Sequence, residues 1–219
     1  MDKKPRRLNF EDVALYAITP EPKNVDTWLD KIDKMLAGGV DAVQFRSRSL
    51  TDRDMIRVGQ RVKELCAKHD ALFLINNRID LALILDSDGV HVGHEDIPIA
   101  QVRNLIGHRK ILGMSTHSIP EALEAKRAGA DYVSCGPLWA TPTKPEYKPV
   151  GLGLIGLYNA AVSIPFVAIG GIDAGNFDQV VAAGAKTVGI VRALFDAEDP
   201  KALAENFKKK LQSVIPACR

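Results

Sequence analysis

The sequence predicts an α/β protein that folds as a single (β/α)8 TIM barrel. Short runs rich in Val, Ile and Leu alternate along the chain with amphipathic stretches long enough for helices, which is typical of a parallel sheet covered by helices. About eight such units follow one another without a change in composition, and no Walker-type phosphate loop interrupts them. A length of 219 residues fits one such domain. A closed barrel is therefore favoured over an open sheet.

The expected elements follow from this alternation, taken in order. The apolar runs predict strands at residues 14–19, 42–46, 71–76, 89–93, 110–115, 132–136, 166–170 and 187–191. The amphipathic stretches predict helices at residues 25–36, 52–68, 79–85, 99–106, 120–128, 154–161, 176–183 and 200–214. Residues 1–12 then form an N-terminal extension, and residues 13–219 form the barrel domain. The long irregular segment 138–153 predicts a loop that is either functional or mobile.

A glycine pattern recurs where a helix ends and the next strand begins. It occurs at residues 38–43, 129–133 and 184–188. Glycine can take the left-handed conformation that ends a helix, and the apolar residues after it restart an extended chain. If these junctions share one end of the barrel, the residues that follow the strands gather at the other end, where barrels carry their sites.

Composition excludes several classes of protein. Lys and Arg total 29 against 27 for Asp and Glu, an excess too small for a protein that binds nucleic acid by neutralising phosphates. Cys66, Cys135 and Cys218 are an odd number without a close pair, which fits neither a disulfide framework nor a zinc site. No apolar stretch has the length of a signal peptide or a membrane span. These features predict a cytoplasmic protein without nucleic-acid or membrane partners.

The residues that follow the expected strands are mostly cations, hydroxyls, amides and glycines, with few carboxylates. Guanidinium and ammonium groups pair with phosphate charge, and hydroxyl and exposed N–H groups donate to phosphate oxygens. This rim therefore predicts binding of small phosphorylated molecules. The candidate residues are Gln44, Arg46, Arg48, Asn76, Asn77, Ser115, Thr141, Thr143, Lys144, Gly171, Val191 and Arg192.

Two of these patterns can be explained either by anion binding or by an ordinary structural role. Arg46 and Arg48 lie two residues apart at a strand end, so their side chains point the same way and can hold one anion. The alternative is a surface salt bridge to Asp52 or Asp54. The segment 141–145 places two hydroxyls and an ammonium group between prolines, which suits either a lid that closes over an anion or an ordinary Pro-rich loop.

Asp96 is the best acidic candidate for a Mg²⁺ ligand, because Mg²⁺ prefers few carboxylates together with phosphate oxygens and water. The alternative is that Asp96 caps the helix expected just after it. His117 could act as an acid or base, although a lone histidine is more often structural. Gly170 and Gly171 occupy a position where barrels often bind phosphate through the backbone, and they also suit a tight turn.

Six motifs occur in order at the ends of successive expected strands. They are VQFRSR at residues 43–48, INNRIDLA at 75–82, GVHVGHED at 89–96, GMSTHS at 113–118, GP at 136–137 with TPTKP at 141–145, and AIGGI at 168–172. Each motif is weak alone, but the ordered set is highly specific. In this set the sequence resembles the thiamine-phosphate synthase (thiamine-phosphate pyrophosphorylase) family, which is related to thiazole tautomerase.

The resemblance implies a transferase of thiamine biosynthesis. Such an enzyme joins hydroxymethylpyrimidine diphosphate to hydroxyethylthiazole phosphate with Mg²⁺, and it releases pyrophosphate and thiamine phosphate. The diphosphate leaves first, and the aminopyrimidine stabilises a methylene cation until the thiazole nitrogen captures it. By motif, the pyrimidine would contact Gln44 and Asn76; the diphosphate Arg46, Arg48, Ser115, Thr141, Thr143 and Lys144; the metal Asn77 and Asp96; and the thiazole phosphate the backbone of Gly171, Val191 and Arg192. The catalytic roles would fall to Arg46, Arg48, Ser115 and Lys144.

The sequence departs from the family pattern at four positions. Arg48 replaces Lys, Asn77 replaces Asp, His94 replaces Gln, and Arg192 replaces a small hydroxyl residue. Two alternatives to the synthase stay open. One is a thiazole tautomerase in which His117 moves a proton, and the other is a non-catalytic barrel that binds thiazole phosphate. A homo-oligomer also stays open.

Overall fold

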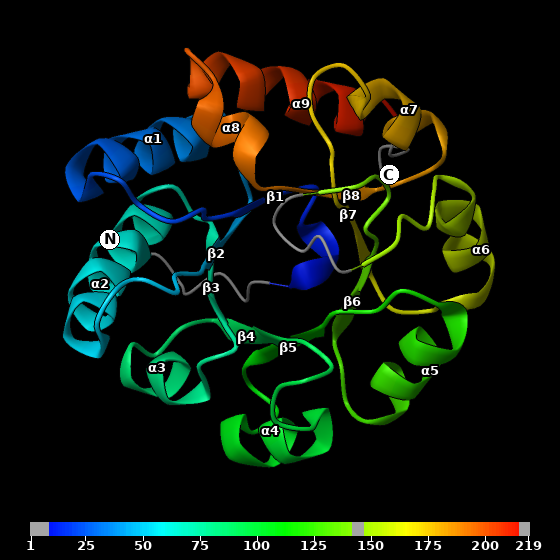
Figure 1. The fold of residues 1–219 in the computed structure, drawn as a ribbon, viewed down its shortest axis with the longest axis horizontal. Coiled ribbons are helices and arrows are strands. Elements are labelled where there is room, and N and C mark those ends of the chain that lie inside the picture. Colours follow the sequence, from blue (N-terminus) through cyan, green and yellow to red (C-terminus); the bar gives the residue numbers. More distant parts are fainter. Residues whose placement is uncertain (1–8, 142–146, 215–219) are drawn as a thin grey trace, which may run out of the picture.

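The computed structural model describes residues 9–141 and 147–214, which form a closed barrel of eight parallel strands ringed by helices (Figure 1). Neighbouring strands follow chain order, and the last pairs with the first, so the (β/α)8 prediction is confirmed. The strands are β1 (Leu15–Ile18), β2 (Ala42–Phe45), β3 (Leu72–Asn76), β4 (Gly89–Val92), β5 (Ile111–Met114), β6 (Tyr132–Cys135), β7 (Phe166–Ile169) and β8 (Thr187–Ile190). The helices are η1 (Phe10–Asp12), α1 (Val25–Ala37), α2 (Asp52–Lys68), α3 (Ile79–Ile84), α4 (Ile99–Ile106), α5 (Ile119–Arg127), α6 (Gly153–Ala161), α7 (Phe177–Ala182), α8 (Arg192–Asp196) and α9 (Pro200–Val214).

The strands are buried on both faces, which explains why they read as continuous apolar runs. In β1, Tyr16 and Ile18 belong to the cluster inside the barrel, whereas Leu15 and Ala17 belong to the cluster between strands and helices. A parallel strand covered on both faces needs apolar residues at every position rather than at alternate ones. This double burial holds the barrel rigid, so that the strand ends can fix the side chains of a site.

The N-terminal end of the barrel is closed by the short helix η1. The ring of Phe10 stacks on Tyr132 with centroids 3.6 Å apart and lies edge-on to Tyr16 at 5.9 Å. In Figure 1, η1 lies within the ring of strands. Residues 9–12, which the sequence suggested as part of an extension, therefore contribute a side chain to the barrel interior. Filling this end leaves the opposite end as the open one.

The helix-to-strand junctions adopt the backbone that the glycine pattern predicts. Gly39, Gly129 and Gly184 have φ values of 97°, 104° and 95°, in the left-handed region. Arg103 of α4 holds one junction, since its guanidinium donates to the carbonyl of Gly129 at 2.8 Å. Because these turns lie before the strands, the polar residues after the strands share the other rim.

Besides η1, one helix was not expected from the sequence. The helix α8 has five residues and follows β8 almost directly, before the expected α9. Five residues are too few to show a helical period, and α8 stands where barrels often carry a short extra helix beside a phosphate site. Within the described ranges, no helix combines the length and the apolar character that crossing a membrane requires.

Candidate active site

A cavity of about 700 Å³ opens at the C-terminal ends of the strands and is lined by residues from all eight strands or the turns that follow them. It is the place where the barrel topology was expected to gather its polar residues. Thr143 and Lys144 lie outside the described residues. The other predicted site residues all line this cavity, namely Gln44, Arg46, Arg48, Asn76, Asn77, Asp96, Ser115, Thr141, Gly171, Val191 and Arg192.

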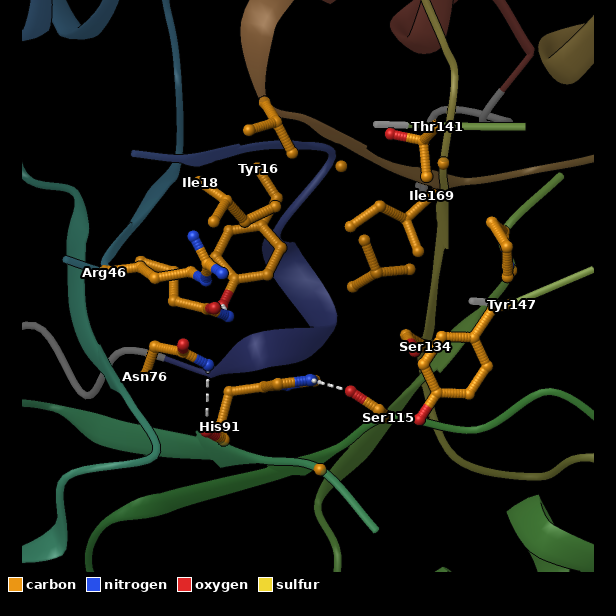
Figure 2. A pocket seen from close by; sticks show the side chains of 18 of the residues that line it. Tyr16, Ile18, Arg46, Asn76, His91, Ser115, Ser134, Thr141, Tyr147 and Ile169 are labelled. Atoms are coloured by element: carbon orange, nitrogen blue, oxygen red, sulfur yellow. Dashed lines mark hydrogen bonds between the residues drawn. The ribbon is translucent and has the colours of Figure 1, made fainter. Parts of the chain in front are cut away.

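Arg46 brings a half-buried positive charge into the cavity from the end of β2 (Figure 2). Its backbone is fixed by Thr19, whose hydroxyl accepts from the Arg46 N–H at 2.8 Å and donates to the Arg46 carbonyl at 2.9 Å. Burial, and then the nearby charge of Arg48, lower the pKa of Arg46. Since a guanidinium stays protonated in proteins, this destabilised cation favours an anion beside it.

The carboxylates suggested as alternative partners for the two arginines are engaged elsewhere. Asp52 pairs with Arg78 at 2.7 Å, and Asp54 pairs with Arg57 at 3.1 Å. The surface salt-bridge explanation therefore does not account for Arg46 and Arg48. Both cations face the cavity instead, as a site for a phosphorylated ligand requires.

Glu21 positions the turn that carries Arg48, and the sequence offered no motif for it. Its carboxylate accepts from the Arg48 N–H at 2.6 Å and from the hydroxyls of Ser47 and Ser49 at 2.6 and 2.7 Å. Burial raises the pKa of Glu21, but these hydrogen bonds outweigh it and hold the pKa below its usual value. Glu21 thus remains ionised and ties the turn after β2 to the loop after β1.

Asn77 lines the cavity with a left-handed backbone, at a φ of 62°. Asparagine is one of the few residues that tolerate this region. The Asn77 N–H donates to the His91 carbonyl at 2.8 Å, and the Asn77 Oδ1 accepts from Asn76 Nδ2 at 2.7 Å. One lone pair of this amide oxygen therefore remains for a further partner.

Asp96 closes the turn after β4. Its Oδ2 accepts from the backbone N–H of Gly93 at 2.6 Å. The helix α4 begins at Ile99, and its N-cap residue, Pro98, makes no side-chain capping bond. The helix-cap explanation for Asp96 thus does not hold. Its carboxylate is held by a backbone N–H at the edge of the cavity, with a second oxygen left for a ligand.

A hydrogen-bond chain crosses the barrel interior from Gln44 to Ser115. Gln44 Nε2 donates to the Tyr16 hydroxyl at 2.7 Å, and the hydroxyls of Tyr16 and Tyr132 lie 3.0 Å apart. The Tyr132 hydroxyl lies 3.0 Å from His91 Nδ1, and His91 Nε2 lies 3.1 Å from Ser115 Oγ, a contact drawn in Figure 2. Burial raises the pKa of both tyrosines, so both hydroxyls keep their protons.

We assign this chain one direction, starting from its first donor. An amide N–H can only donate, so Tyr16 accepts from Gln44; its own proton is then available to Tyr132, and we assign it there. Tyr132 in turn donates to His91 Nδ1, which places the His91 proton on Nε2, toward Ser115. The Ser115 hydroxyl then accepts from His91 and has its proton free to donate to a ligand in the cavity. The sequence did not reveal this chain, because it joins strands that are distant in sequence.

Glycine is required where the turn after β7 meets the turn after β6. Gly171 has a φ of 67°, and a Cβ built there would lie 2.7 Å from the Trp139 Cβ and 3.0 Å from the Ala140 carbonyl oxygen. The Gly171 carbonyl accepts from Asn176 Nδ2 at 2.8 Å. This close approach is the tight turn that the sequence allowed, and Gly171 also lines the cavity.

His117 lines the same cavity from the turn after β5. Its ring stacks on Tyr147 with centroids 4.3 Å apart, and its Nδ1 faces the carbonyl of Gly136. The Nε2 atom is buried and has no hydrogen-bond partner among the residues that the structure describes. The sequence left a structural or a chemical role open for this histidine, and one nitrogen is available for the latter.

Comparison with known proteins identifies the family of the chain. A family model described as thiamine monophosphate synthase matches residues 15–194. A thiamine-phosphate synthase of Desulfitobacterium hafniense (strain Y51) is 43% identical over 199 residues, which cover 89% of this chain and 95% of that protein. One from Synechococcus sp. (strain CC9311) is 39% identical over 198 residues. That alignment covers 90% of this chain but 56% of the relative, so the chain spans little more than half of that protein's length.

A solved structure gives the same result for the fold. The thiamine phosphate pyrophosphorylase from Pyrococcus furiosus superposes with a TM-score of 0.84 at 33% identity, over 93% of this chain and 97% of that chain. The resemblance that the six motifs indicated is thereby confirmed. The chain belongs to the thiamine monophosphate synthase family.

Proposed function

We propose that the protein is a thiamine-phosphate synthase, a transferase of thiamine biosynthesis. In this reaction hydroxymethylpyrimidine diphosphate and hydroxyethylthiazole phosphate give thiamine phosphate and pyrophosphate. Family membership supports the proposal, and so does the cavity, whose donors and cations suit two phosphorylated substrates. The observation that carries it is the half-buried Arg46, next to Arg48 and facing a cavity lined by amides and hydroxyls.

The residues suit a reaction that begins with departure of the diphosphate. The bond between the pyrimidine methylene carbon and the diphosphate oxygen breaks, and its electron pair stays on the oxygen. Arg46, Arg48 and the Ser115 hydroxyl then hold the leaving group, whose charge grows in this step. The thiazole nitrogen supplies the electron pair that forms the new C–N bond to the methylene cation. Such a step needs stabilised charge and exclusion of water more than a general base.

Gln44 is oriented for the pyrimidine. Because its Nε2 donates to Tyr16, the amide oxygen is left to accept from the amino group of an aminopyrimidine. Asn76 reaches the same cavity from β3. In our proposal the backbone N–H groups of Gly171, Val191 and Arg192 bind the thiazole phosphate. Thr141 would contact the diphosphate. In the same proposal Thr143 and Lys144, which lie outside the described residues, also bind the diphosphate.

We propose Mg²⁺ as the cofactor, held by Asp96 and Asn77. Both present oxygen atoms at the cavity, and oxygen is the ligand type that Mg²⁺ requires. One carboxylate and one amide leave coordination positions for diphosphate oxygens and water, as Mg²⁺ prefers. When bound, Mg²⁺ neutralises part of the diphosphate charge. The residues described above orient both substrates around it.

The direct test is incubation of the purified protein with both substrates and Mg²⁺, followed by chromatography of the products. We expect thiamine phosphate and pyrophosphate in equal amounts. Formation of neither product by the folded protein would refute the synthase proposal. Omission of the thiazole phosphate serves as the control for simple hydrolysis of the diphosphate.

The available Nε2 of His117 favours a second candidate, a thiazole tautomerase. Such an isomerase moves a proton on the thiazole and does not need Arg46 or Asp96. Isomerisation by the wild-type protein that disappears in His117→Ala, together with no coupling of the two substrates, would establish this alternative. The diphosphate-binding cations in the cavity favour the synthase.

The protein is proposed to work in the cytoplasm. Cys66 and Cys135 are buried free thiols, which suits a reducing compartment. A homo-oligomer is also proposed, since Leu83 and Ile84 of α3 and Leu105 of α4 leave apolar side chains exposed. Light scattering of the purified protein measures its mass directly, and a monomer at all concentrations would contradict the oligomer.

A further inference from the structure

Three potential metal ligands meet beside the proposed magnesium residues. His94 lies in the turn after β4, His117 in the turn after β5, and Glu121 in the first turn of α5. One ligand atom from each of them lies within 4.8 Å of the other two. We call these three residues the His–His–Glu cluster. Neither the proposed reaction nor the proposed Mg²⁺ site uses it.

His117 is held in the state that a metal needs. Its Nδ1 faces the Gly136 carbonyl, which can only accept, so Nδ1 carries the proton and Nε2 carries a lone pair. A backbone carbonyl on the other ring nitrogen is the usual outer partner of a metal-bound histidine. The Nε2 lone pair is buried without a hydrogen-bond partner in the described part of the chain, which is unfavourable unless something binds it.

Glu121 and His94 complete the set. Glu121 Oε2 accepts from the backbone N–H of His117 at 2.7 Å and lies 3.0 Å from His94 Nε2. Burial raises the pKa of Glu121, but the hydrogen bonds from His117, Ser118 and His94 outweigh it, so the carboxylate is ionised. It also lies at the N-terminus of α5, where the helix dipole favours negative charge.

We propose that the His–His–Glu cluster is a Zn²⁺ site. In a tetrahedral site with bonds of about 2.0–2.1 Å, neighbouring ligand atoms lie roughly 3.3 Å apart. The contact between His94 and Glu121, at 3.0 Å, is already close to this spacing. Zn²⁺ would replace the proton between these two groups, and that proton would leave to solvent. Movement of the His94 and Glu121 side chains would bring the ion to His117 Nε2, while His117 Nδ1 keeps the Gly136 carbonyl.

Three protein ligands leave one tetrahedral position open. Because His94 and His117 both line the cavity, this position faces the proposed active site and would take water or a phosphate oxygen of a ligand. The site differs from the proposed Mg²⁺ site in its chemistry. Imidazole nitrogen suits Zn²⁺, whereas Asp96 and Asn77 offer only oxygen, which suits Mg²⁺.

The test is titration of the full-length, metal-free protein with Zn²⁺ by calorimetry, in excess Mg²⁺ so that the oxygen site is already saturated. Cobalt(II) replaces Zn²⁺ in a second titration, because its visible absorption reports tetrahedral coordination. We expect one Zn²⁺ per chain in the wild type. His94→Gln and His117→Asn should each weaken binding by more than about 10-fold and abolish the tetrahedral cobalt spectrum.

His108 gives the matched control, since it is an exposed histidine outside the cluster. His108→Gln should bind Zn²⁺ as the wild type does, and circular dichroism confirms that each variant is folded. No binding by the wild type in this titration would overturn the site. Equal affinity of wild type, His94→Gln and His117→Asn would overturn it as well. The experiment uses no substrate, so its outcome is independent of the proposed reaction.

Discussion

Removing one buried hydroxyl from the hydrogen-bond chain between Gln44 and Ser115 tests whether this chain orients the Ser115 hydroxyl. In Tyr132→Phe the ring remains, with its stacking on Phe10, but the hydroxyl between Tyr16 and His91 is lost. His91 Nδ1 then has no Tyr132 proton to accept. The preference for a proton on His91 Nε2 falls, so the Ser115 hydroxyl can donate to His91 instead of to a ligand in the cavity.

General hydrogen-bond energies, applied to the contacts of Tyr132 and Ser115, give two magnitudes for this change. Leaving a buried polar atom unsatisfied costs about 1–3 kcal/mol in the free energy of unfolding. A hydrogen bond from Ser115 to a charged diphosphate is worth about 1.5–3 kcal/mol, which corresponds to a decrease in kcat/KM of roughly 10- to 150-fold. Tyr132 itself does not touch the substrates in our proposal, so it acts as a positioning residue.

The assay measures release of pyrophosphate at varied concentrations of the pyrimidine diphosphate, alongside urea unfolding. Thr187→Val is the matched control, because it also removes one buried hydroxyl, the one that donates to the Val13 carbonyl at the opposite end of the barrel. Both variants should lose stability, and only Tyr132→Phe should lose kcat/KM. An unchanged kcat/KM in Tyr132→Phe would refute the positioning role of the chain.

Three further predictions concern the proposed Mg²⁺ site, the stability of the barrel and the reactivity of the Cys135 thiol. Asn77→Asp keeps a residue that tolerates a φ of 62° and adds a carboxylate to the proposed Mg²⁺ site. The Mg²⁺ concentration that gives half-maximal activity should therefore fall about 10-fold. An unchanged concentration would contradict the metal role of residue 77. Arg103, whose side chain is 8% exposed, donates to Asp131 at 2.6 Å and to the carbonyls of Gly107 and Lys110 at 2.7 and 2.8 Å. Arg103→Met should therefore lower the free energy of unfolding, measured in urea, by about 3–5 kcal/mol. The activity of the folded protein should stay unchanged. A loss of activity without a loss of stability would contradict the purely structural role of Arg103. Burial raises the pKa of Cys135 to about 12, so about one thiol in 10⁴ is ionised at pH 8, and mass spectrometry should find Cys135 alkylated only after unfolding. Because the folded pKa lies above the unfolded value of about 8.5, the contribution of this thiol to stability is complete below that pH and is lost as the pH rises above it.

The barrel was predictable because its signals are local. The expected strand at 42–46 and the expected helix at 79–85 differ from β2 and α3 by one residue each. Apolar runs covered on both faces and glycines at the junctions do not depend on distant contacts. The helix α8 and the placement of Phe10 inside the barrel were not predictable, because neither segment is long enough to show a period.

The site was predictable in its membership but not in its geometry. Topology alone brings strand ends together, which is why Gln44, Arg46 and Ser115 line one cavity. The sequence left Asp96 as either a helix cap or a ligand, and the contact with Gly93, which excludes the cap, is visible only in three dimensions. The role of Glu21 also depends on packing between separate loops, for which the sequence carries no local signal.

The central claim is that the half-buried charge of Arg46 stabilises the departing diphosphate. The most direct measurement compares the rate of thiamine phosphate formation by wild type and Arg46→Gln at saturating Mg²⁺ and substrates. Loss of one preorganised donor to a developing negative charge predicts a rate lower by about 100-fold or more. Equal rates in the two proteins would contradict the claim.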